Sequence, residues 1–356
     1  MRPAQAHSPQ RFPRLVRLWR DQSGAMAALA AFMLTALVGL TGAAVDLGLL
    51  YSTKGELQNA ADAAALAGAA TMVSFGENGD ISVQPITAVT TAQQVSLANQ
   101  AHGVNLSLRS DDAVIGYWDT EADAFDPGLT GSSDPNDITG FQATVRRDEL
   151  ANGPVNTFFA GLVGYGSVGL RATSTAFLGW AGLADAAAVD LPLAIHASAL
   201  TEAGSPNCGA ELLFNNENDE TAEWTSFFTW PTNDVTVRNY VDGGLTTPEL
   251  KVGDSINVIN GNLSTATMNA LADRFQVQGA DTDGDGAADS WEVLVPVVEP
   301  GSTSTMSKVV GFAHLVMTEA DSSKARFYLQ CGRALIGSNS GGGNYGTRAT
   351  VPSLIQ

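Results

Sequence analysis

The sequence predicts an α+β protein with a single N-terminal transmembrane helix that continues into a helix outside the membrane, followed by mixed α/β and β-rich domains. Three observations predict this class. An uncharged apolar run follows a basic head, an alanine-rich stretch with helical spacing comes next, and short alternating segments separated by turn signals fill the rest. The 356 residues suffice for two domains, each with its own core.

Charge divides the chain into two unequal parts. Residues 1–22 hold five arginines and one aspartate, a net charge of +4, whereas the whole chain carries −19. The body is therefore strongly acidic, and an acidic surface repels nucleic acid and attracts cations. We expect no nucleic-acid partner. The expected boundaries are a basic segment at 1–21, an anchor at 22–46, an alanine-rich extended helix at 47–76, an α+β domain at 77–180 and a β-rich C-terminal domain at 181–356.

The apolar run from residue 22 to residue 45 has no formal charge. Its 24 residues make about 36 Å of helix, enough to cross roughly 30 Å of hydrocarbon. Arginines flank only its N-terminal side, so the positive-inside rule places the N-terminus in the cytoplasm. A cleaved signal peptide is the alternative, but its apolar core is shorter, and no proline follows the run until Pro85. We expect an uncleaved signal anchor that crosses the lipid bilayer once.

Residues 47–73 form a second predicted helix, rich in alanine, the strongest helix former. It begins after Asp46, which stands at the outer edge of the apolar run. Its narrow apolar stripe, at spacings of three and four, consists of Leu57, Ala61, Ala64, Gly68 and Met72. Such short side chains permit close backbone approach. The stripe suits packing against another helix or against the protein's own body, and a solvated spacer helix is the alternative.

Three N-terminal motifs occur in a specific order: residues 21–25 (DQSGA), 44–48 (AVDLG) and 57–69 (LQNAADAAALAGA). In this order they resemble the N-terminal module of TadG-like Flp pilus-assembly proteins, and the likeness continues more loosely through residues 155–162 and 172–176. The resemblance implies an envelope protein of the tight-adherence (Tad) pilus machinery. It implies an inner-membrane anchor, a periplasmic body and other Tad/Flp pilus-assembly proteins as partners.

Two departures limit what the resemblance implies. Some members carry a von Willebrand A-type domain with an Asp-x-Ser-x-Ser metal loop, whereas residues 189–195 (VDLPLAI) lack the serines. We therefore expect no von Willebrand A metal loop. Related pilin-like subunits carry a glutamate five positions after a glycine as a processing signal, but the fifth residue after Gly24 is Leu29. This argues against pilin-type cleavage and against a role as the polymerising subunit.

The body divides near residue 180. Before it, helical spacing at 88–99 and alternation at 105–118, 141–146 and 169–178 predict an α+β domain with a short helix at 156–162. After it, residues 265–275 predict one helix, and residues 337–345 read as a glycine-rich turn region. The strand candidates are residues 189–195, 212–214, 235–240, 255–258, 291–298, 308–317 and 325–329.

Cys208 and Cys331 are the two cysteines of the chain. In an oxidising periplasm we expect them to form a disulfide, which would close a loop of about 120 residues. Two buried free thiols are the alternative. Their spacing does not suit a zinc site, which needs close pairs of Cys or His.

Residues 281–292 (DTDGDGAADSWE) match the twelve-residue calcium loop at its defining positions. Calcium takes six to eight hard oxygen ligands, which clustered carboxylates and a backbone carbonyl can supply. The expected ligands are the carboxylates of Asp281, Asp283, Asp285, Asp289 and Glu292 and the carbonyl of Ala287. The flanks differ from an EF-hand, because a strand follows the loop. We expect a structural calcium site of the weaker extracellular class, and an acidic turn that needs no ion is the alternative.

Enzyme signatures are weak in this sequence. Residues 164–169 (GYGSVG) fit the dinucleotide fingerprint in form, but they lead into a strand, so we expect no nucleotide partner. The sequence shows no zinc-protease helix, nucleophile elbow or phosphate loop. The four histidines are isolated in sequence, and we expect surface or core roles for them: His7, His102, His196 and His314. We therefore expect no enzyme.

The sequence thus predicts a non-enzymatic, membrane-anchored scaffold or accessory component of Flp pilus assembly. Two alternatives remain open. One is an envelope-bound polysaccharide hydrolase, which would need a pair of carboxylates in one cleft. The other is a surface adhesin stiffened by the calcium loop, which would leave pilus number normal while mediating attachment.

Overall fold

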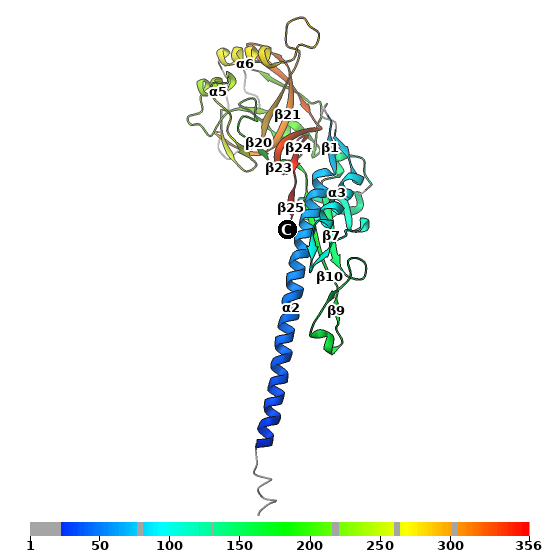
Figure 1. Cartoon of the computed structure of the whole chain (residues 1–356). Coiled ribbons are helices and arrows are strands. Elements are labelled where there is room, and N and C mark those ends of the chain that lie inside the picture. The colour runs from blue at the N-terminus through cyan, green and yellow to red at the C-terminus, as the bar shows by residue number, and fades with distance from the viewer. Residues whose placement is uncertain are drawn as a thin grey trace, which may run out of the picture.

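The computed structural model describes residues 23–76, 81–120, 122–129, 131–215, 221–259, 264–300 and 305–355. One long helix extends from a β-rich body, and the C-terminus of the chain lies beside this helix (Figure 1). The predicted mixed class, with a long apolar N-terminal helix and a β-rich remainder, is confirmed. The basic segment predicted at residues 1–21 lies outside the described residues.

Helix α2 (Ser23–Thr71) is continuous over 49 residues. It is rich in alanine and contains no proline, so its sequence has no strong helix breaker. The Thr35 hydroxyl donates to the Ala31 carbonyl at 2.9 Å, which leaves no unpaired hydroxyl at this point of the apolar surface. Large apolar side chains of the first half are exposed, Phe32 to 78% and Leu40 to 70%. Among the described helices, α2 is long and apolar enough to cross a membrane.

The second half of α2 packs on one face of a five-stranded antiparallel sheet, beside helix α3 (Pro85–Leu97). Buried and half-exposed side chains alternate along the strand at 140–147, as expected for a sheet with one face on the core. In order across the sheet, the strands are β25 (Ser353–Ile355), β10 (Leu170–Phe177), β7 (Gly140–Arg147), β5 (Ala113–Asp119) and β6 (Ala124–Asp126).

Short paired strands and 3-10 turns connect these elements. The predicted strand at 105–118 is interrupted, because a 3-10 turn places Asp112 in an ion pair with Arg146 at 2.5 Å. The predicted helix at 156–162 is a hairpin with one 3-10 turn. The connecting elements are β1 (Val73–Phe75), β2 (Ile81–Val83), β3 (Gln100–Ala101), β4 (Val104–Asn105), η1 (Ser110–Asp112), η2 (Pro127–Leu129), η3 (Pro135–Asp137), β8 (Val155–Asn156), η4 (Ala160–Val163) and β9 (Ser167–Val168).

A seven-stranded sheet forms most of the remaining body. The longest strand, at 306–320, pairs with three others, and one pair of the sheet, β13 with β20, is parallel. A second core lies on this sheet. In order, the strands are β16 (Glu211–Asn215), β22 (Lys324–Gln330), β21 (Met306–Ala320), β19 (Ser255–Ile259), β17 (Ala222–Phe227), β13 (Leu193–His196) and β20 (Trp291–Pro300).

Three helices accompany this sheet: α4 (Ala197–Leu200), α5 (Asp234–Val241) and α6 (Thr265–Gln278). The strand predicted at 235–240 is wrong, since these residues belong to α5. The Asn233 side chain caps this helix by accepting from the Thr236 N–H at 2.9 Å, and Val237, Tyr240 and Val241 become buried at helical spacing. The cap and the buried face outweigh the β preference of valine and threonine.

The C-terminal residues connect the second part of the body to the first sheet. Strand β25 pairs with β10. Two strands that precede it, β23 (Arg333–Gly342) and β24 (Thr347–Val351), pair with each other and with β11 (Trp180–Ala181). Shorter pairs join β12 (Leu183–Ala184) to β18 (Leu250–Lys251) and β14 (Thr201–Glu202) to β15 (Ser205–Pro206). The glycine-rich turn predicted at 337–345 is therefore strand as far as Gly342.

Arg348 lies at this connection and is fully buried. Its guanidinium donates to the carbonyls of Pro135 at 2.5 Å, Ile138 at 2.7 Å and Leu178 at 2.8 Å, and it lies over the Trp180 ring, 5.1 Å from the centroid. Burial lowers the pKa of Arg348 to about 10, so the side chain remains charged at neutral pH. One buried cation thus joins segments that are far apart in the chain.

Candidate functional site

Asp46 directly follows the uncharged apolar run of α2 and is only 4% exposed. Its carboxylate accepts from three consecutive backbone N–H groups, those of Phe158 at 2.8 Å, Phe159 at 3.0 Å and Ala160 at 2.7 Å. One side chain therefore satisfies the donors at the start of η4. The position of Asp46 at the end of the apolar run is visible in the sequence, but its partners lie more than 110 residues away and carry no sequence signal.

Gly42 lies one helical turn before Asp46 and contacts the same hairpin. A Cβ added at Gly42 would lie 2.6 Å from Cγ of Phe159, so glycine permits the ring to approach the helix backbone. The small residues in the apolar run suggest close helix packing in a bilayer. At Gly42 the close neighbour is instead a residue of the same chain.

The alanine-rich stripe of α2 is buried at all of its positions: Leu57, Ala61, Ala64, Gly68 and Met72. It packs against the first sheet and α3, so the second half of the helix belongs to the core and is not a solvated spacer. The tightest contact is at Gly68, where an added Cβ would lie 2.5 Å from Cδ1 of the buried Phe141 ring.

Polar contacts also fix the rotation of α2 on the body. The Lys54 ammonium donates to the Arg171 carbonyl of β10, and the Glu56 carboxylate accepts from the His102 N–H at 2.6 Å. Because these contacts and the buried stripe lie on the same helix as the apolar run, the direction of the exposed half is set by the body.

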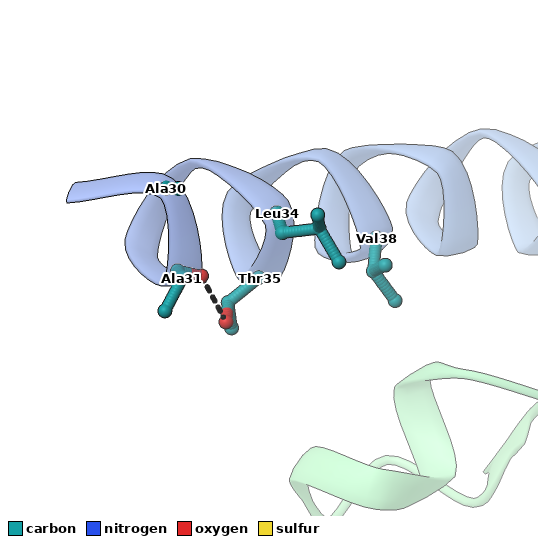
Figure 2. A pocket seen from close by; sticks show the side chains of 5 residues that line it. All are labelled: Ala30, Ala31, Leu34, Thr35 and Val38. Atoms are coloured by element: carbon teal, nitrogen blue, oxygen red, sulfur yellow. Dashed lines mark hydrogen bonds between the residues drawn. The ribbon is translucent and has the colours of Figure 1, made fainter. Parts of the chain in front are cut away.

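The exposed half of α2 has an apolar face with few polar atoms. Figure 2 shows Ala30, Ala31, Leu34, Thr35 and Val38, which line a shallow hollow along this face. The single hydroxyl among them is bonded within the helix. No group drawn there is a general acid, base or charged ligand, so the face suits lipid tails or another apolar helix rather than a polar substrate.

The acidic loop between α6 and β20 brings three of the predicted ligands together. One carboxylate oxygen from each of Asp281, Asp283 and Asp285 lies within 4.8 Å of the other two, and all three residues are exposed. Gly286 has φ +90°, the left-handed conformation that the predicted sharp turn requires. The donor set is hard oxygen, which fits calcium. The loop is closed at its base by Ala280, whose N–H donates to the Ser290 carbonyl at 2.7 Å.

The two remaining predicted carboxylates have other partners. The Asp289 carboxylate accepts from the Thr282 N–H at 2.6 Å and from its hydroxyl at 2.5 Å, and these bonds lower the pKa of Asp289. Glu292 forms an ion pair with Arg333, Oε1 to Nε 2.9 Å, and the N–H of Ala287 donates to Asp285 at 2.8 Å. Three of the five carboxylates therefore share one site, and the other two lie in neighbouring contacts.

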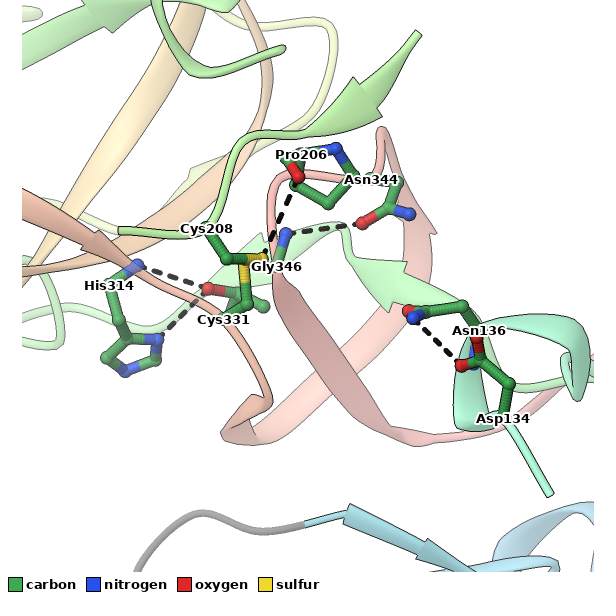
Figure 3. Close-up of a disulfide and its surroundings, with 9 residues drawn as sticks. Asp134, Asn136, Pro206, Cys208, His314, Cys331, Asn344 and Gly346 are labelled. Atoms are coloured by element: carbon green, nitrogen blue, oxygen red, sulfur yellow. Dashed lines mark hydrogen bonds between the residues drawn. A yellow bond between two sulfur atoms is a disulfide. The ribbon is translucent and has the colours of Figure 1, made fainter. Parts of the chain in front are cut away.

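The predicted disulfide between Cys208 and Cys331 is present, with Cα atoms 5.5 Å apart, and it joins the segment before β16 to the end of β22 (Figure 3). His314 lies beside it, partly buried, with Nδ1 3.0 Å from the Thr347 hydroxyl. Burial and the nearby Arg333 charge lower the pKa of His314 to about 4. The ring is therefore neutral at pH 7.

A second histidine lies in a buried polar group that superficially suggests hydrolase chemistry. Glu223 accepts from the Ser307 hydroxyl at 2.5 Å, and its Oε2 lies 3.5 Å from Nε2 of His196. In a Ser–His–acid triad the histidine stands between the hydroxyl and the carboxylate. Here the carboxylate stands in the middle and Ser307 is 2% exposed, so the hydroxyl is bonded to the carboxylate instead of a histidine and is shielded from substrate.

Two family models match the chain. One, described as Flp pilus-assembly TadE/G-like, matches residues 24–71, and the other, described as Tad-like Flp pilus-assembly, matches residues 50–176. Neither the comparison with curated proteins nor the comparison with solved structures gives a match. The matched residues include α2, its Asp46 contacts and most of the first sheet. Residues 24–176 therefore match Tad-type models of Flp pilus-assembly proteins, in agreement with the resemblance that the N-terminal motifs carry.

Proposed function

We propose that this protein is a non-enzymatic scaffold or accessory component of Flp pilus assembly, held in the inner membrane by residues 22–46, with the N-terminus in the cytoplasm and the body in the periplasm. The observation that carries the proposal is the division of α2. Its first half exposes apolar side chains, while its second half is built into the body of a Tad-type domain.

Several features support an uncleaved anchor and this orientation. Helix α2 continues through the end of the apolar run, whereas signal peptidase cleavage follows a short apolar core. The arginines precede the run, and the body that follows it is acidic and contains a disulfide, which persists in an oxidising compartment. Other pilus-assembly proteins are the proposed partners, since the matched residues belong to that family.

Protease protection tests the topology. In intact spheroplasts, added protease should digest the body and leave a membrane-bound N-terminal fragment, whereas a cytoplasmic marker protein should remain intact. Protection of the body until the membrane is broken would contradict the proposed orientation.

Complementation of a deletion strain tests the role in assembly. The full chain should restore pili, and so should a chain in which residues 22–41 are replaced by an unrelated single-pass anchor of the same length. A chain in which a cleavable signal peptide replaces residues 22–41 should not restore pili, because its body would no longer be tethered to the membrane. A deletion strain with normal pilus number and lost attachment would contradict the assembly role and favour an adhesin.

Calcium is the cofactor that the acidic loop would hold. We propose that Asp281, Asp283 and Asp285 provide carboxylate ligands and Ala287 a carbonyl, so that the ion stiffens the connection between α6 and β20. The support is the exposed triad together with the twelve-residue pattern.

Thermal unfolding of the full chain tests the calcium proposal. Extracellular-type sites have dissociation constants of about 0.1–1 mM, so ~10 mM calcium should stabilise the fold by about 1.4–2.7 kcal/mol. The substitution Asp283→Ala should abolish this gain. Asp111→Ala, at an exposed acid outside the loop, should retain it. An unfolding curve of the unmodified protein that does not respond to calcium would exclude the site.

A further inference from the structure

The hairpin that Asp46 holds has an unusual surface for a water-facing segment. We call residues 154–169 the anchor hairpin; it consists of β8, η4 and β9. No charged residue occurs between Glu149 and Arg171. Large apolar side chains near its tip are strongly exposed: Phe158 to 71%, Leu162 to 83% and Tyr165 to 71%. A cluster of this kind at one place marks a surface that meets another apolar phase.

The anchor hairpin lies at the outer end of the proposed membrane span. From Ser23 to Asp46 the helix rises about 34 Å, slightly more than the hydrocarbon thickness of a bilayer. Asp46 therefore stands near the outer interface, and Phe159 packs at Gly42, about 6 Å deeper. In Figure 1 the anchor hairpin, which carries the label β9, extends alongside α2 toward the N-terminal half of that helix. Figure 2 shows the green ribbon of this segment beside the helix just beyond Val38.

The backbone of the anchor hairpin is largely paired, as an apolar environment requires. The Thr157 N–H donates to the Gly166 carbonyl at 3.1 Å, and the Tyr165 N–H donates to the Ala160 carbonyl at 2.9 Å. Three consecutive N–H groups at the start of the turn donate to the Asp46 carboxylate. Without Asp46 these donors would need water, so this side chain makes the tip compatible with lipid.

We propose that the tip of the anchor hairpin inserts into the outer leaflet of the membrane that α2 crosses, with Phe158, Leu162 and Tyr165 at the boundary between headgroups and acyl chains and with Asp46 as the positioning residue. This inference rests on the proposed anchor. The occupant of the surface is lipid, because the hairpin is continuous with the apolar face of the span, carries no charge and lies at the interfacial depth that aromatic side chains favour.

A consequence is that the body meets the bilayer at two points. A single helix leaves a body free to rotate and tilt, whereas a second insertion beside it restricts tilt. The fixed rotation of α2 on the first sheet transmits this restriction to the whole body. The hairpin would thus hold the distal end of the body, where Figure 1 shows α6, at a defined height and direction above the membrane.

Depth measurements on the full chain, reconstituted at one chain per lipid nanodisc, test the inference. A fluorescent label is attached at one introduced cysteine at a time, in Leu162→Cys at the tip, Leu34→Cys on the exposed half of α2 or Val277→Cys on α6. All three side chains are exposed and apolar. Quenchers carried on the lipid acyl chains should strongly quench the labels at 162 and 34, and iodide in the water should quench only the label at 277.

The outcomes separate this inference from the anchor proposal. A label at 162 that iodide quenches as readily as the one at 277, while the label at 34 remains in lipid, would overturn the hairpin insertion and leave the anchor intact. Water exposure at 34 would overturn the anchor itself. Shielding at 162 from both quenchers, or lipid quenching that is lost when two chains share a disc, would assign the tip to protein contact and overturn the lipid assignment.

The role of Asp46 is tested with the same label. The substitution Asp46→Ala removes the acceptor of three N–H groups, so lipid quenching at 162 should fall and iodide quenching should appear, while the label at 34 stays in lipid. As a matched control, Asp62→Ala removes a carboxylate from the same helix, whose partner is Gln58, and should leave quenching at 162 unchanged. Equal quenching at 162 in both variants would exclude Asp46 as the positioning residue.

Discussion

Gly68 provides a quantitative test of how α2 is built into the body. The substitution Gly68→Ala adds one methyl group that would lie 2.5 Å from Cδ1 of Phe141, a ring that is fully buried. Neither the ring nor the helix can move without disturbing the core, and overpacking of this kind costs about 1–3 kcal/mol. The same change at Gly55, which is exposed and has no atom near the added Cβ, gives only the gain in helix propensity, about 1 kcal/mol.

Because both substitutions add the same methyl group to the same helix, their propensity terms cancel in the difference. The free energy of unfolding of Gly55→Ala should therefore exceed that of Gly68→Ala by about 1–3 kcal/mol. Chemical denaturation of the full chain in nanodiscs, followed by near-UV circular dichroism, measures this difference. Equal stability of the two variants would refute the close contact between the stripe and the first sheet.

A double substitution sharpens the reasoning. Phe141→Leu removes the ring edge that the added methyl group would meet, although it leaves unfilled volume of its own. Gly68→Ala should then cost less in the Phe141→Leu background than in the native chain, and this coupling is a direct measure of the contact. Strictly additive effects of the two substitutions would contradict the proximity of the two residues.

Three further predictions concern the rest of the fold. The pKa of His314 is about 4 in the folded protein and about 6.5 in the unfolded chain, so the unfolded chain binds the proton more readily. The free energy of unfolding should therefore be highest above pH 6.5 and fall by up to about 3 kcal/mol toward pH 4. The substitution His314→Asn should flatten this pH dependence. Without reductant, Cys331→Ser should have a free energy of unfolding about 2–4 kcal/mol below that of the native chain. With reductant, which opens the disulfide of the native chain, the difference between the two proteins should be smaller. Arg348→Met should lower the free energy of unfolding by about 3 kcal/mol, because three carbonyls lose their hydrogen-bond donor, and it should speed amide hydrogen exchange in β10.

Local periodicity predicted the parts of the fold whose packing is local. The spacing of Leu57, Ala61 and Ala64 identified the buried face of α2, and the alternation at 141–146 identified β7, because each pattern reflects one face of one element. The strand predicted at 235–240 was wrong because β-branched residues occur in both states, and the cap at Asn233 selected the helix.

Features that depend on distant contacts could not be read in this way. Gly342 lies in β23, which pairs with β11, and it must be glycine because a side chain there would collide with the Ala181 backbone; this neighbour is more than 150 residues away. The same applies to Asp46, whose hydrogen-bond donors are in the anchor hairpin. The acidic loop is intermediate: its spacing identified the triad at 281–285, but the Thr282 contact of Asp289 and the Arg333 contact of Glu292 depend on the folded loop and on β23.

The pairing of β25 with β10 has a consequence for the order in which the protein can be completed. Strand β10 is synthesised early and packs on the second half of α2, whereas its outer neighbour, Ser353–Ile355, comes more than 170 residues later. At translation rates of 5–20 residues per second, the edge of β10 stays open for roughly 10–35 s while the intervening residues are synthesised. An open edge is a template for pairing with other chains. A product truncated before Ser353 therefore leaves this edge of the first sheet uncovered, whereas a chain that includes β25 does not.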